Sequence, residues 1–140
     1  MINAKELRIG NWLTLLVKNE NLGEVKTRLN FQIKNGIHLD KIVNTTNQED
    51  FIEKILLTTD LLIKCGFAVY GKLDNDYTTH GNGGNSSSFF LQIDWRYREL
   101  GYYPMIKSEE FEIIGERIKY VHQLQNLYYS LTQEELECAI

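Results

Sequence analysis

The sequence is poor in several residue types, and each shortage narrows what the protein can be. It contains a single proline and two cysteines, and no apolar run approaches the length of about 18 residues that a membrane-spanning helix needs. The first residues, MINAKELRIGNW, carry three charges where a signal peptide would be apolar, so secretion is not expected. Cys65 and Cys138 share no metal-ligand spacing with each other or with any of the three histidines. We therefore expect reduced thiols in a cytosolic setting, and neither a metal nor a cofactor.

The composition of the 140 residues is typical of a folded protein. Hydrophobic residues make up 43% and charged residues 24%, which disfavours disorder and coiled coils and fits one domain spanning 1–140. Residues 1–43 carry seven Lys or Arg and four acids, whereas residues 44–140 carry eight and fifteen. The basic end suggests weak nucleic-acid binding through Lys18, Lys26, Arg28 and Lys34, although this charge is thin for a nucleic-acid surface.

The N-terminal third has the pattern of an antiparallel β-meander, residues 1–43. A β-prone run at 12–17 is followed by apolar alternation over 25–33. Asn35-Gly36 is a strong signal for a tight hairpin turn, with the return strand ending at Val43. Such a meander predicts a small curved sheet, in the form of an SH3-like partial barrel.

The remaining chain predicts a helix, a second strand group and a final helix. Thr58 caps a short helix over 58–66, strands fill 67–114 around a flexible Gly- and Ser-rich loop at 74–88, and helix occupies 118–139. Pro104 is expected at a strand end or edge, and Thr132 with Glu135 forms a capping box for a second short helix. The predicted fold class is α+β.

No catalytic motif stands out, and an enzyme is not indicated. The segment HGNGGNSSS lacks the lysine of a phosphate-binding loop and leads into a strand instead of a helix. The acidic residues form no paired motif, and no serine lies in a nucleophile elbow.

The segment YVHQLQNLYYSLTQ is a helix without a charged side chain. One face carries the apolar core stripe, and the opposite face carries His122, Gln125, Asn126 and Tyr129. Exposed helix faces normally carry charge, whereas interface cores lack it and are rich in aromatic residues. Three explanations stay open: burial within the chain, self-association or a protein partner, and a pocket for a small molecule or nucleotide.

Three phrases of the sequence resemble a family of short proteins found in phages and integrated mobile elements of anaerobic gut-type bacteria. These phrases are KELRIGN, LLTTDLLIKCGF and IKYVHQLQNLYYSLTQEEL. The shared motif falls on Gly10, Asn11, Lys64, Gly66, Phe67 and residues 121–128. The resemblance implies a mobile-element origin and action inside a bacterial host cell, and it implies no reaction.

The sequence therefore predicts a small cytoplasmic protein that binds, and does not catalyse. The first expectation is a protein partner or homo-oligomer at the uncharged face of the last helix. The alternatives are a small-ligand or nucleotide-sequestering protein and a weak nucleic-acid binder.

Overall fold

The computed structural model describes residue 2 and the ranges 4–18, 26–45, 51–70, 77–82, 89–94, 101–107, 111–113 and 115–140. Its elements are η1 (Ala4–Glu6), β1 (Trp12–Lys18), β2 (Lys26–Gln32), α1 (Gly36–Asn44), β3 (Ile52–Lys54), α2 (Thr59–Lys64), β4 (Phe67–Tyr70), β5 (Tyr77–Asn82), β6 (Phe89–Asp94), β7 (Tyr103–Lys107), β8 (Phe111–Ile113) and α3 (Val121–Thr132). No helix within these ranges is long and apolar enough to cross a membrane.

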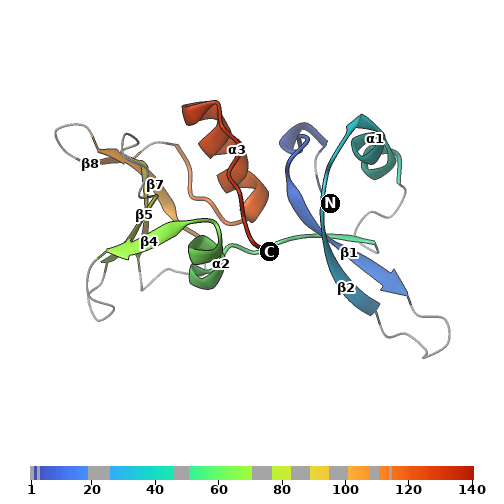
Figure 1. The fold of residues 1–140 in the computed structure, drawn as a ribbon, viewed down its shortest axis with the longest axis horizontal. Coiled ribbons are helices and arrows are strands. Elements are labelled where there is room, and N and C mark those ends of the chain that lie inside the picture. Colours follow the sequence, from blue (N-terminus) through green and yellow to red (C-terminus); the bar gives the residue numbers. More distant parts are fainter. Residues whose placement is uncertain are drawn as a thin grey trace.

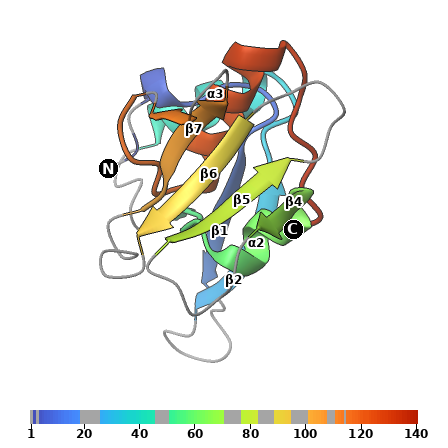
Figure 2. The same ribbon diagram turned by 90° about the vertical axis from the view of Figure 1, so that its left-hand side faces the viewer.

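Two antiparallel sheets and three α-helices make an α+β fold, as predicted. The first sheet has the order β2-β1-β3, and the second has the order β4-β5-β6-β7-β8, in which each strand pairs with its neighbour in sequence. Helix α3 lies between the two sheets (Figure 1), and a quarter turn shows β4 to β7 side by side (Figure 2). An SH3-like closure of the first sheet stays a prediction.

The predicted hairpin at Asn35-Gly36 is wrong, because this pair begins helix α1. Asn35 has extended backbone angles (φ −160°, ψ 173°), and its side-chain oxygen accepts the backbone N–H of His38 at 3.1 Å. Asparagine is as favourable at a helix N-cap as in a tight turn. The third strand of the first sheet is instead β3, which pairs with β1 from Leu13 to Leu15.

The spacing of apolar residues after Gly36 explains the error. Ile37 and Leu39 alternate as in a strand, but Leu39, Ile42 and Val43 follow helical spacing. Ile42 is buried with Leu39 packed beside it, whereas Ile37 is the most exposed of the large hydrophobic residues at 66%. Burial of the helical set outweighs the local turn preference.

The central helix and most of the later strands match their predictions. Thr58 accepts the backbone N–H of Leu61 at 3.2 Å as the N-cap of α2, and Gly66 ends the helix at φ +81°. Pro104 is the second residue of β7 and opposes Leu91, while pairing of β7 with β8 begins only at Met105. Part of the predicted loop 74–88 is strand β5, and the remainder of that loop lies outside the described residues.

Two apolar clusters hold the elements together. One joins α2, α3, Phe67 and Tyr102, with Trp12 of β1 packed against it. The other joins β1, β3 and α1 around Leu13, Ile33 and Ile42, with Ile2 and Leu7 from either side of η1. Strand β1 therefore contributes to both clusters, which links the two parts of the fold.

The chain after α3 differs from the prediction in two respects. No second helix forms, because Gln133 takes the left-handed conformation (φ 61°) and residues 135–140 are irregular. Leu136 is nevertheless buried in the same apolar cluster as Leu124 of α3, as expected. The thiols are also not free, since Cys138 forms a disulfide with Cys65 at the end of α2. Sequence spacing could not reveal this pair, because 73 positions separate the two cysteines.

The helical start at Gly36 gives a direct test. A Cβ on Gly36 would meet no atom within 4 Å, so Gly36→Ala should raise the free energy of unfolding by about 0.4–1 kcal/mol. Gly66→Ala, the matched control at φ +81°, should lower it by about 1 kcal/mol. Chemical denaturation measures both, and a loss of stability in Gly36→Ala would favour the hairpin.

The disulfide gives a second test. Closing a loop across 73 positions stabilises a fold by roughly 4 kcal/mol in the chain-entropy description. Dithiothreitol should therefore lower the melting temperature of the wild-type protein. The Cys65→Ala/Cys138→Ala variant serves as the control, because a reductant should not change its melting temperature.

Candidate functional site

The four residues predicted on the uncharged face of α3 differ strongly in exposure. His122 and Gln125 are completely buried, Asn126 is half-buried, and Tyr129 is 38% exposed. The residues that cover them belong to the segment Glu6–Trp12, which runs from η1 into β1. The inner part of this face, His122 and Gln125, is thus buried within the chain, which was one of the three explanations, while Tyr129 stays exposed.

Gln125 binds the backbone of this segment with both ends of its amide. Its Oε1 accepts the backbone N–H of Trp12 at 2.9 Å, and its Nε2 donates to the carbonyl of Gly10 at 2.9 Å. The Gly10 carbonyl also accepts Gln32 Nε2 at 3.0 Å. A buried amide that completes two backbone hydrogen bonds needs no external ligand to explain it.

Asn126 and Asn11 extend the same network. Asn11 Nδ2 donates to Asn126 Oδ1 at 2.9 Å, and Asn126 Nδ2 donates to the Glu6 carbonyl at 2.6 Å. Asn11 is also completely buried, and its Oδ1 accepts the backbone N–H of Arg8 at 2.8 Å. We call Gln125, Asn126 and Asn11, with the backbone groups that they bind, the amide network.

Arg8 occupies the outer edge of the amide network. Its guanidinium donates to the backbone carbonyl of Gln125 at 3.0 Å and pairs with the Glu135 carboxylate. It also lies 4.4 Å from the centre of the Tyr129 ring. Gly10 leaves room for Glu135, because a Cβ at Gly10 would come within 2.7 Å of Glu135 Oε2. Arg8 and Glu135 thereby connect the N-terminal segment to the chain after α3.

His122 is buried without a hydrogen bond on either ring nitrogen. Its Nε2 lies 3.6 Å from Glu6 Oε2, beyond hydrogen-bond distance, and Lys54 binds that same oxygen at 2.9 Å. Burial, reinforced by the nearby Lys54 charge, lowers the pKa of His122 to about 4. The hydrogen bond that Lys54 donates to Glu6 lowers the pKa of the Glu6 carboxyl. His122 is therefore a neutral core residue at pH 7.

This burial limits what the predicted site residues can do. His122 and Gln125 present no surface to a partner, so a partner at this face could contact only Asn126 and Tyr129 of the four. Three of the basic residues proposed for nucleic acid share one face of β1 and β2 by register, because Lys18 opposes Lys26 and Arg28 follows two positions along β2. Arg28 pairs with Glu53 at 3.1 Å, and Lys34 is exposed beside α1. Lys18 and Lys26 are paired across β1 and β2, and their side chains lie outside the described part.

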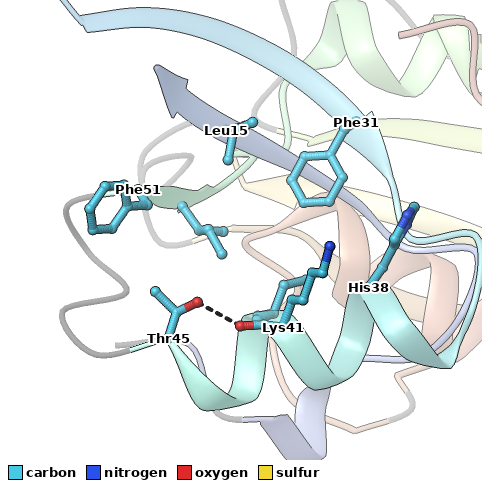
Figure 3. Close-up of a pocket in the computed structure, with 8 residues that line it drawn as sticks. Leu15, Phe31, His38, Lys41, Thr45 and Phe51 are labelled. Carbon is cyan, nitrogen blue, oxygen red and sulfur yellow. Dashed lines mark hydrogen bonds between the residues drawn. The ribbon is translucent and has the colours of Figure 1, made fainter. Parts of the chain in front are cut away.

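A pocket of about 420 Å³ lies between α1 and the first sheet, where no site was predicted from the sequence. Figure 3 shows α1 on one side and Leu15 and Phe31 on the other. We call it the α1 pocket; it is lined by Leu15, Phe31, His38, Lys41, Ile42, Thr45, Phe51 and Ile52. Its size falls within the range of about 300–1,000 Å³ typical of small-molecule sites. Leu15 and Phe51 remain 36% and 40% exposed, so the pocket is open to solvent.

The polar groups of the α1 pocket all come from α1 and its end. Thr45 donates its hydroxyl to the carbonyl of Lys41 and is thereby engaged. His38 Nδ1 accepts the backbone N–H of Lys34 at 3.3 Å, which leaves Nε2 to act as the ring's donor. Among the described residues, no carboxylate lines the pocket, and Lys41 supplies the positive charge. The described lining is thus an apolar surface with hydrogen-bond donors and a cation.

Sequence reasoning missed this pocket because it assigned 37–43 to a strand. In a helix, His38 and Lys41 are three positions apart and share one face with Ile42 and Thr45. The helical spacing of Leu39, Ile42 and Val43 was the signal that could have revealed this face.

No protein-family model, no curated protein and no solved structure matches this chain. Function must therefore be argued from the described residues themselves. Among these residues, no three His, Cys, Asp or Glu side chains lie close enough to share a metal ion.

Replacing Gln125 or His122 by leucine should have different effects on stability, because only Gln125 has hydrogen-bond partners in the amide network. Gln125→Leu leaves the Trp12 N–H without its acceptor and removes one of the hydrogen bonds to the Gly10 carbonyl. It should lower the free energy of unfolding by about 2–4 kcal/mol. His122→Leu removes two nitrogens that have no hydrogen-bond partner and should be close to neutral at pH 7. Urea denaturation of the two variants measures the contrast, and equal costs would contradict this description.

The buried His122 also predicts loss of stability in acid. Its folded pKa of about 4 lies below its ordinary value of 6.5, so the unfolded chain binds the proton first and stability falls as pH drops through this window. The loss should reach about 3 kcal/mol by pH 4. Glu6, whose pKa is lowered by Lys54, adds to the loss only as the pH falls below its ordinary pKa of 4.5. His122→Leu should therefore show a flatter stability profile between pH 6.5 and 5, and an unchanged profile would refute the assignment.

Proposed function

We propose that this protein is a non-catalytic binding protein that holds a small apolar ligand in the α1 pocket. The supporting observation is the pocket itself, which has about 420 Å³ of space bounded by aliphatic and aromatic side chains on a sheet and a helix. Its lining includes Leu15, Phe31 and Phe51, which are not fully covered by the chain. Covering them with a ligand would contribute about 25 cal/mol per Å² of apolar surface removed from water.

A ligand-binding role was one of the alternatives expected from the sequence, but it was expected at the α3 face. The proposed site is the α1 pocket instead. The polar residues of α3 are satisfied by Glu6–Trp12, so their lack of charge has an internal cause. The α1 pocket, in contrast, combines apolar walls with the amine of Lys41, which forms no ion pair with a described residue; small-molecule sites likewise place a few polar groups in apolar walls.

A binding role also agrees with the resemblance to the phage and mobile-element family, which implies no reaction. Under this proposal the protein acts in the cytoplasm of a bacterial host. The Cys65–Cys138 disulfide is unusual for that compartment, where thiols are kept reduced. Thiol alkylation of protein taken rapidly from the cytoplasm would show which state prevails there.

Self-association remains a weaker proposal and needs another contact surface. Ile9 and Tyr129 flank Arg8 at 49% and 38% exposure, and they provide an apolar surface beside the amide network. Light scattering on wild-type protein and on Tyr129→Glu would test it.

Binding can be tested with the neutral dye N-phenyl-1-naphthylamine, which fluoresces in apolar sites. Wild-type protein should give a saturable signal at one dye per chain, with an affinity in the micromolar range typical of a modest apolar site. Leu15→Trp, which fills the pocket from β1, should abolish it. Ile63→Trp places the same ring on the exposed face of α2 and should bind like wild type. Equal signals from both variants would contradict the proposal.

A further inference from the structure

Lys41 extends its charged amine across the α1 pocket. In Figure 3 its side chain leaves α1 and its nitrogen points toward Phe31 and Leu15, on the facing strands. No ion pair forms at this amine within the described part of the chain. Asp40, which precedes Lys41, accepts from Asn44, and Glu53, which follows the lining residue Ile52, pairs with Arg28. Among the described residues, the charge of Lys41 therefore has no acidic partner.

From this geometry we propose that the ligand of the α1 pocket is a free single-chain carboxylate, with its head at Lys41 and its chain against Leu15, Phe31 and Phe51. This inference rests on the proposed function and names its ligand class. A cation among apolar side chains favours an anionic group, because a charge-assisted hydrogen bond is stronger where water is partly excluded.

The donors match a carboxylate better than a phosphate. His38 and Lys41 lie one helical turn apart on α1, and both line the pocket, so His38 Nε2 offers a second donor on the same helix face. One amine with a further N–H donor suits the two oxygens of a carboxylate. A phosphate would bring more charge and more acceptors than the lining residues provide.

The apolar surface indicates an elongated ligand. Leu15 is paired with Leu29 across β1 and β2, and Val17 follows two residues later on the same face of β1. Leu29 and Val17 are 52% and 39% exposed, and neither belongs to the pocket lining. The apolar strip therefore continues beyond the pocket along the sheet, which a linear chain can follow and a compact ring system cannot.

The experiment compares decanoate with 1-decanol by isothermal titration calorimetry at neutral pH, with each compound kept monomeric. Wild-type protein should bind decanoate about tenfold more tightly than decanol, as expected for one partly exposed charge interaction. Lys41→Gln should lose this difference while still binding decanol. Lys34→Gln removes an exposed lysine that does not line the pocket and should retain it. In Lys41→Glu the preference should shift to decylammonium.

The outcomes separate this inference from the proposed function. Equal affinities for decanoate and decanol, or an unchanged preference for decanoate in Lys41→Gln, would overturn the carboxylate and leave the apolar pocket in place. Failure of all the decyl compounds to bind, together with no dye signal, would overturn both.

Discussion

The hydrogen bonds between the side chains of α3 and the backbone of Glu6–Trp12 are the constraint on which the arrangement of the two sheets depends. The Trp12 N–H and the Gly10 carbonyl lie at the entrance to β1, and Gln125 satisfies both. Because unpaired backbone groups are costly to bury, α3 can lie here only with its amides directed at this segment. Trp12 then packs with the cluster of α2 and α3, which connects the first sheet to the second.

The same contact explains why α3 carries no charge. A lysine or glutamate at position 122 or 125 would place a charge where the exposed fraction is zero, and burial of an uncompensated charge is strongly unfavourable. The charges that are present lie at the edge: Arg8 pairs with Glu135, and Lys54 pairs with Glu6. The disulfide Cys65–Cys138 attaches the segment after α3 to the end of α2. The uncharged helix thus packs inside the protein and connects the N-terminal segment to the C-terminal one.

The α1 pocket forms where one face of the first sheet is incompletely covered. Helix α1 covers Leu13 and Ile33, but Leu15 and Phe51 extend past it. The resulting surface combines apolar side chains with Lys41, whose charge has no partner among the described residues. The proposed ligand site therefore lies on α1, whereas α3 holds the N-terminal segment in place.

Local sequence determined the elements whose signals agree with one another: the cap of α2 at Thr58, the alternation in β2, the apolar stripe of α3 and the α+β class. Where two local signals competed, tertiary burial decided. Asn35-Gly36 suits a turn or a helix start, and packing of Ile42 against the sheet selected the helix. The partners of Gln125, the disulfide and the α1 pocket likewise arise only when segments distant in sequence meet. Periodicity identifies which residues share a face, but what covers that face depends on contacts between residues more than a hundred positions apart.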